Sequence, residues 1–187
     1  MQFTERSIQG AFRVDVVPVQ DDRGRFARAW CAEEFATQGL TEAFVQANLV
    51  HTHRAGTVRG LHYQVAPHEE AKYIRCIRGA VYDVILDLRP DSPTYLQWHG
   101  ETLTGDSQAA FYVPSGCAHG YQTLTDDAEV FYQVSTPYSP GAERGICYDD
   151  PTFDVEWPHP VTVVSEKDQS WASFDQTQHE ALFTQPR

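Results

Sequence analysis

The chain has 187 residues, of which 41% are hydrophobic, and a formal net charge of −12 at pH 7. This length is consistent with one domain, residues 1–187, that buries a core of its own. The acidic balance and the absence of a basic run disfavour binding to nucleic acid through its phosphates. No apolar run is long enough to span a membrane, so no membrane partner is expected.

The cysteines form no C-x2-C pair, which disfavours a zinc site or a thioredoxin-like redox site. The four are Cys31, Cys76, Cys117 and Cys147. The N-terminal residues lack the apolar region of a secretory signal. We therefore expect reduced cysteines and a cytoplasmic location.

The first fifty residues mix short strands with one helix. Strands are expected over residues 1–20, followed by a turn at 21–24, where the sequence is DDRG. A helix is predicted over 32–40, because acidic residues come early and Gly39 is typical of the residue that follows a helix. A strand is predicted over 44–52.

The middle of the chain reads as a series of short strands. From Ala80 to Leu88, apolar residues alternate with others that include Asp83 and Asp87, which predicts a strand with one buried face. After a turn, further strands are expected over 94–103, 109–113, 119–124 and 129–136. Many strands and few helices predict an antiparallel sandwich or barrel. The tail after Asp168 fits either a short helix or a packed extension.

The stretch from Gly56 to Gly79 nearly matches the first motif of the cupin barrel, G-x5-H-x-H-x3/4-E-x6-G. Its histidine is His62. Gln64 stands where the second histidine belongs, and Lys72 stands where the glutamate belongs, after a longer gap. Because an ammonium group has no lone pair to give to a metal, the motif predicts metal-free acid–base chemistry.

The second cupin motif, P-x-G-x2-H-x3-N, is present at Pro114, Gly116 and His119, with Thr123 in place of its asparagine. Both motifs resemble those of cupins. This resemblance sharpens the predicted sandwich or barrel to an all-β fold, a cupin-type antiparallel jelly-roll barrel with a few short helices. We expect three segments: N-terminal strands and a short helix in 1–50, the barrel core in 51–168, and a C-terminal extension in 169–187.

Strand parity points Tyr132 into the barrel, because it shares a face with Val130 and Val134. A buried phenol needs a polar partner. Since imidazole and phenol could meet in one cavity, the parity of the histidine strand also matters.

In that strand, His62 and Gln64 share a face with Val58. Arg59 has the opposite parity. It joins the others only if the strand is irregular, and Gly60 is where a bulge would occur. Otherwise Arg59 serves another surface.

At these residues the chain resembles the dTDP-4-dehydrorhamnose 3,5-epimerases and related nucleotide-sugar epimerases. The matching segments are VRGLHYQ, AKYIRCIRGAVYDVILDLRPDSPTY, VPSGCAHGYQTL, SPGAERGICYDDP and VSEKD. The resemblance runs from about Asp22 to Asp168. It implies an isomerase that inverts C3, C5 or both in a nucleotide-linked 4-keto-6-deoxy hexose, foremost dTDP-4-keto-6-deoxyglucose of the dTDP-rhamnose pathway, without a cofactor.

The resemblance implies catalytic roles for four residues. His62 would be the base that removes a proton next to the ketone, and Asp168 would hold its other ring nitrogen. Tyr132 would be the acid on the opposite face of the sugar. Lys72 would place a positive charge near the C4 oxygen, where negative charge develops. No residue is assigned to a metal.

The resemblance also assigns ten residues to substrate binding. They are Arg23, Phe26, Arg28, Gln46, Asn48, Arg59, His119, Tyr138, Glu143 and Lys167. Tyr138 occupies the position of an aromatic residue that stacks on the base. Arg28 replaces a glutamate that usually contacts the nucleoside, and Ala47 replaces an aspartate. The choice among dTDP, CDP and GDP therefore stays open.

Other functions remain to be weighed. An epimerase of a single position, C3 or C5, would use the same residues. A metal-dependent cupin enzyme needs three or four ligands in one cavity, whereas a non-catalytic sugar-binding cupin needs neither acid nor base. The family resemblance further implies a homodimer in which an N-terminal segment is exchanged and helps to complete the partner's site.

Overall fold

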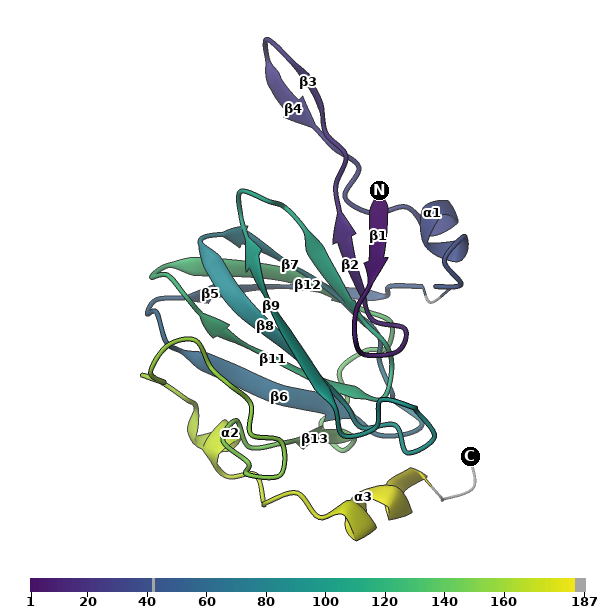
Figure 1. The fold of residues 1–187 in the computed structure, drawn as a ribbon, viewed down its shortest axis with the longest axis vertical. Helices are drawn as coiled ribbons and strands as arrows, with labels where there is room; N and C mark the ends of the chain where they lie inside the picture. The colour runs from purple at the N-terminus through teal and green to yellow at the C-terminus, as the bar shows by residue number, and fades with distance from the viewer. Residues whose placement is uncertain (42, 184–187) are drawn as a thin grey trace.

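The computed structural model describes residues 1–41 and 43–183 and consists mainly of antiparallel strands in two facing sheets (Figure 1). The six-stranded sheet contains, in spatial order, β1 (Gln2–Glu5), β2 (Phe12–Asp15), β10 (Ala110–Val113), β7 (Lys72–Arg78), β12 (Ala128–Val134) and β5 (Gln46–Thr52). The five-stranded sheet contains β13 (Glu143–Gly145), β6 (Val58–Gln64), β11 (Cys117–Thr123), β8 (Ala80–Asp87) and β9 (Trp98–Thr104). The predicted all-β jelly roll with few short helices is confirmed.

The main core fills the space between the two sheets. Ile74 and Phe111 come from the six-stranded sheet, Ile85 and Leu103 come from the five-stranded sheet, and all four are fully buried. Burying an aliphatic or aromatic side chain of this size contributes about 1.5–3 kcal/mol. The free energy of these contacts holds the two walls of the barrel together.

A second apolar layer covers the outer side of the five-stranded sheet. Val84 and Leu86 of β8 pack there with Phe153. As a result, the prediction that β8 buries only one face is wrong: Asp83 and Asp87 are completely buried. The run VILDL is nearly continuous in apolar residues, which is typical of a strand covered on both sides.

Two predicted boundaries also differ from the structure. The strand predicted over 94–103 begins only at Trp98, because the preceding residues form turns, in which the Leu96 N–H donates to the Asp87 carbonyl over 2.8 Å. Helix α1 (Ala32–Ala36) is shorter than the predicted 32–40. Its end is closed by a hydrogen bond of 3.1 Å from the Leu40 N–H to the Phe35 carbonyl, with Gly39 at a φ of +77°.

The predicted turn at 21–24 lies in a hairpin made of β3 (Val19–Asp21) and β4 (Gly24–Phe26). Figure 1 shows this hairpin standing away from the two sheets, at the top of the view. Val19 and Phe26 are 71% and 76% exposed. This hairpin, residues 19–26, is called the arm below. In the single chain it carries apolar side chains into solvent.

Two helices lie near the C-terminus: α2 (Glu166–Gln169), at the end of the predicted barrel core, and α3 (Gln176–Phe183), in the tail after Asp168. The last four residues of the predicted extension lie outside the described residues. His179 of α3 is buried, and its Nε2 donates to the Leu88 carbonyl over 2.7 Å, while Nδ1 lies 3.3 Å from the Tyr63 hydroxyl. The sequence leaves open whether the tail is a short helix or a packed extension. In the structure it contains a short helix that packs on the barrel through His179. None of the helices in the described ranges has the length and apolar character to cross a bilayer.

The docking of α3 should make stability depend on pH. Burial lowers the pKa of His179 from its ordinary 6.5, although the Leu88 carbonyl and Glu180 oppose that shift. The unfolded chain therefore binds the proton more readily, and the free energy of unfolding should fall as pH drops below about 6.5. Urea unfolding at pH 7.5 and 5.5 should show a larger loss for the wild type than for His179→Gln. Equal losses would contradict this role.

Candidate active site

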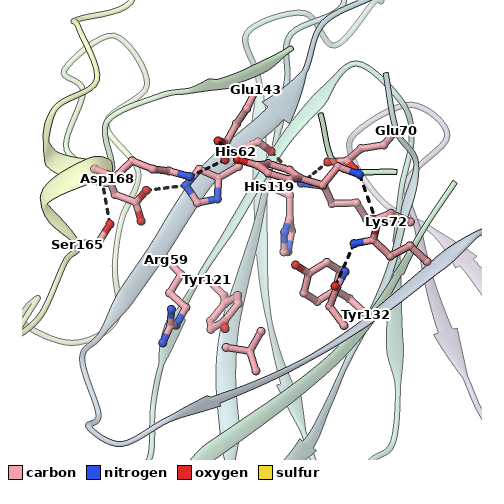
Figure 2. A pocket seen from close by; sticks show the side chains of 16 residues that line it. Arg59, His62, Glu70, Lys72, His119, Tyr121, Tyr132, Glu143, Ser165 and Asp168 are labelled. Carbon is pink, nitrogen blue, oxygen red and sulfur yellow. Dashed lines mark hydrogen bonds and ion pairs between the residues drawn. The ribbon is translucent and has the colours of Figure 1, made fainter. Parts of the chain in front are cut away.

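A cavity of about 600 Å³ opens between the two sheets, and Figure 2 shows its lining. Eleven of the fourteen residues predicted for the site line it. They are His62, Tyr132, Asp168, Lys72, Gln46, Asn48, Arg59, His119, Tyr138, Glu143 and Lys167. In Figure 2, His62 and Asp168 lie on one side, and Lys72 and Tyr132 lie on the other.

His62 and Asp168 form a short polar contact. His62 Nε2 lies 2.6 Å from Asp168 Oδ1, although the two residues are 106 positions apart. Burial alone would raise the pKa of Asp168. The hydrogen bond and charge of His62, together with the Gly60 N–H, outweigh that effect, so the pKa is lowered overall. An ionised carboxylate can only accept, so Nε2 carries the proton and the Nδ1 of a neutral His62 keeps its lone pair.

Helix α2 presents Asp168 to the histidine strand. The Ser165 hydroxyl accepts a hydrogen bond of 3.1 Å from the Asp168 N–H, which caps the helix. The Gly60 N–H donates to Asp168 Oδ2 over 3.3 Å. The carboxylate is therefore fixed by backbone and side-chain bonds, and 5% of its side chain is exposed.

An irregularity in β6 brings Arg59 to the cavity. In the pairing of β6 with β11, His62 lies opposite His119 and Arg59 lies opposite Tyr121, so three steps on one strand meet two on the other. The irregularity lies between these pairs, at Gly60 and Leu61, and a Cβ at Gly60 would lie 2.6 Å from the backbone of β11. Arg59 therefore faces the same side of the sheet as His62, although strict alternation would place them on opposite sides.

The same shift turns Val58 away from the cavity. Val58 is buried but does not line the cavity, so the expected common face of Val58 and His62 is wrong. Arg59 Nε donates to the Thr52 hydroxyl over 3.1 Å. No carboxylate of the described residues lies within ion-pair distance of Arg59, which leaves its charge available to an anion.

Lys72 links the two walls of the cavity. It lies on β7, and its Nζ donates to the His62 carbonyl over 3.0 Å and lies 3.2 Å from Glu70 Oε1. Gln64 Nε2 donates to Glu70 Oε2 over 3.1 Å. The ammonium is thus held in place with 8% of the side chain exposed. Gln64 itself is buried and does not line the cavity.

Tyr132 projects from β12 into the cavity and packs against the main core. Burial raises its pKa, Glu70 and Glu143 raise it further, and Arg59 opposes them. A raised pKa keeps the phenol protonated at neutral pH. Its hydroxyl has no hydrogen-bond partner among the described residues, so it is available to a bound molecule.

His119 is held by a buried carboxylate that sequence reasoning missed. His119 Nε2 lies 3.0 Å and 2.9 Å from the two oxygens of Asp83. Burial raises the pKa of Asp83, and the neighbouring His119 opposes that rise. The pair fixes the orientation of the imidazole in the cavity.

Polar residues also line the outer part of the cavity. Glu143 accepts from the Tyr138 hydroxyl over 2.8 Å and from Lys167 Nζ over 2.6 Å. Burial alone would raise the pKa of Glu143, but these two partners lower it overall. Tyr138 is 54% exposed, which leaves its ring face open. Gln46 Nε2 donates to Asn48 Oδ1 over 3.1 Å.

Three predicted substrate residues do not line this cavity. Arg23 and Phe26 belong to the projecting hairpin, where Arg23 pairs with Asp21. Arg28 Nη1 donates to Glu34 over 2.7 Å. All three side chains are largely exposed in the single chain.

Five lining residues were not predicted: Val50, Glu70, Tyr121, Val134 and Ser165. Val50, Tyr121 and Val134 each lie two positions after a predicted site residue on the same strand. The two-residue repeat of a strand therefore offers a signal that would have found them. Glu70 and Ser165 lie outside strands, where no such repeat applies.

Comparisons with known proteins agree on one family. The family model for dTDP-4-dehydrorhamnose 3,5-epimerase matches residues 5–176. An enzyme of that name from Sinorhizobium fredii is 41% identical over 154 residues, which cover 82% of this chain and 79% of the relative. A dTDP-4-dehydrorhamnose 3-epimerase from Streptomyces niveus is 36% identical, with coverage of 90% and 82%.

A solved structure gives the same result. The Bacillus anthracis dTDP-4-dehydrorhamnose 3,5-epimerase, with TDP and PPi bound, superposes with a TM-score of 0.89 at 36% identity, covering 92% of this chain and 99% of that one. Sequence, fold and the matched span agree: this isomerase belongs to the dTDP-4-dehydrorhamnose 3,5-epimerase family.

Proposed function

We propose that this enzyme epimerises a dTDP-linked 4-keto-6-deoxy hexose, foremost dTDP-4-keto-6-deoxyglucose, at C3 and C5. The observation that carries the proposal is the placement of a carboxylate-bound imidazole and a protonated phenol on opposite sheets of one cavity. Inversion needs proton removal from one face of a carbon and proton delivery to the other. Both carbons flank the C4 ketone, so both carry protons that the carbonyl acidifies.

His62 is the base in this proposal. Its Nδ1 keeps the lone pair because Nε2 donates to Asp168. When Nδ1 takes the sugar proton, the adjacent carboxylate stabilises the imidazolium that forms. The C–H electron pair forms a double bond to C4, and the π pair of the C4 carbonyl moves to its oxygen, which gives an enolate.

Lys72 and Tyr132 complete the cycle. The ammonium of Lys72 stabilises the enolate oxygen, in a setting where a fixed charge requires little reorganisation. Tyr132 then delivers its proton to the opposite face of the carbon, where the enolate electron pair forms the new C–H bond. The Tyr132 phenolate takes up a proton from solvent and His62 passes its proton to solvent, which restores both groups. The raised pKa of Tyr132 supports this role, because the phenol holds a proton to give.

The outer part of the cavity suits the nucleotide. Arg59 lacks a carboxylate partner among the described residues, which supports its assignment to the diphosphate. Tyr138 offers an open ring face to the base. The relatives named for dTDP sugars favour thymidine. Arg28 and Ala47, which depart from the family pattern, both lie outside the cavity lining.

Inversion of C3 alone is the second candidate, favoured by the 36% identity to a 3-epimerase. Proton NMR in D2O with dTDP-4-keto-6-deoxyglucose would separate the two. Loss of both the C3 and C5 proton signals, with formation of the doubly inverted sugar, indicates the 3,5-epimerase. Loss at C3 alone indicates the single-position enzyme.

We infer that the enzyme works as a homodimer that exchanges its N-terminal hairpin. The hairpin stands away from its own barrel, and Val19 and Phe26 on it are largely exposed. Apolar side chains in such a position favour cover by another chain. Arg23 on the same arm would then enter the partner's cavity. A cytoplasmic location is supported by the four cysteines, which are free of disulfide bonds.

The catalytic proposal predicts different effects for base and acid. His62→Ala should abolish both deuterium uptake from D2O and epimerisation, with losses of ~10²–10⁴-fold. Tyr132→Phe should reduce inversion more than uptake, because His62 can still remove a proton and return it to the same face. Uptake by His62→Ala above about a tenth of the wild-type rate would rule His62 out as the base.

The dimer proposal predicts rescue between two inactive variants. The double variant Arg23→Ala/Phe26→Ala lacks the two side chains of the arm that would contact substrate, and His62→Ala lacks the base. In a mixed dimer, the intact cavity of the first receives the intact arm of the second. Refolding an equal mixture should restore roughly a quarter of wild-type activity, since half the dimers are mixed and each holds one complete site. No recovery above the separate variants would show that the arm does not act in the partner's site.

A further inference from the structure

A cluster of three metal-ligating side chains lies outside the cavity: His51, His53 and Asp127. His51 Nε2 is 3.2 Å from Asp127 Oδ1, and His53 Nδ1 is 3.7 Å from the same oxygen. One donor atom from each of the three residues lies within 4.8 Å of the other two. Two ligands of a tetrahedral Zn²⁺ at ordinary bond lengths are separated by roughly 3.3 Å. The three groups are therefore close to the spacing that one ion requires.

Backbone contacts hold the cluster together. His51 is on β5, His53 follows it, and Asp127 lies in the turn before β12. The Asp127 N–H donates to the His53 carbonyl over 3.2 Å, and the Ala55 N–H donates to Asp126 Oδ1 over 2.8 Å. The turn is thus fastened to the end of β5, so little chain ordering would remain for an ion to impose.

The cluster is separate from the catalytic cavity. Gln46, Asn48 and Val50 of β5 line the cavity. His51 has the opposite parity and therefore points to the outer face of the six-stranded sheet. All three residues of the cluster are exposed.

Nearby charges are compatible with a cation. Glu129 lies opposite His51 in the pairing of β12 with β5, and Arg78, 3.7 Å from Glu129, is held by that carboxylate. Asp126 adds a second acidic side chain to the turn. The net charge of the chain is −12. Arg54, which follows His53, forms no ion pair with the described residues, so the surroundings hold charges of both signs and do not exclude a cation.

We propose that His51, His53 and Asp127 form a Zn²⁺-binding site that ties the end of β5 to the turn before β12. Two imidazoles and one carboxylate suit zinc and its neighbours in the transition series better than Mg²⁺ or Ca²⁺, which prefer oxygen ligands alone. Water would fill the remaining position. The site has no part in proton transfer, because it faces away from the substrate.

The test is a Zn²⁺ titration of the full chain, without a histidine tag, in competition with a chromophoric chelator. We expect one ion per chain and at least a ten-fold weaker Kd in His51→Ala, in His53→Ala and in Asp127→Asn. The matched control is His68→Ala, which removes another exposed histidine and should bind as the wild type does. Absorption by bound Co²⁺ in the visible range would report the same site and the same ranking.

Two results would overturn the proposal. One is an unchanged Zn²⁺ affinity in all three cluster variants. The other is the absence of saturable binding to the wild type. Zinc should also raise the Tm of the wild type and not that of His51→Ala. Chelation by EDTA should lower that Tm to the metal-free value and leave epimerisation unchanged.

Discussion

The chemistry proposed for the cavity depends on one hydrogen bond, between His62 Nε2 and Asp168 Oδ1 at 2.6 Å. It fixes which nitrogen carries the proton, and so which nitrogen can act as a base. Together with the bond from the Gly60 N–H to Asp168 Oδ2, it ties helix α2 to β6, while the Ser165 hydroxyl caps that helix. Without Asp168, His62 would lose its preferred tautomer and the stabilisation of its charged form.

The jelly roll places the other groups around that pair. Because the two sheets face each other, Tyr132 on one wall can oppose His62 on the other, and Lys72 can bond across to the His62 backbone at 3.0 Å. The bulge at Gly60 turns Arg59 inward, where its charge meets no carboxylate of the described residues. A rigid barrel thus holds the proposed base, acid and cations at fixed positions before substrate arrives.

The many short strands could be predicted because alternation and turns are local signals, whereas the cupin motifs and the family resemblance predicted the jelly roll and most of the cavity lining. Parity could not foresee the shifted face of Val58, which depends on how β6 pairs with β11. It also missed Asp83, since the alternation in β8 gave no sign of the outer apolar layer. Arg23, Phe26 and Arg28 lie away from the single-chain cavity, and their roles, like the division of the chain at residues 50 and 168, stay predictions.

The central claim is that Asp168 makes His62 a base. The most direct measurement is deuterium uptake into dTDP-4-keto-6-deoxyglucose by Asp168→Asn, with dTDP affinity and Tm measured on the same preparation. An amide retains the size of the carboxylate but not its charge, so uptake should fall by ~10² or more, while dTDP affinity and the folded state remain. Uptake within about ten-fold of wild type in a folded variant that binds dTDP normally would contradict the claim.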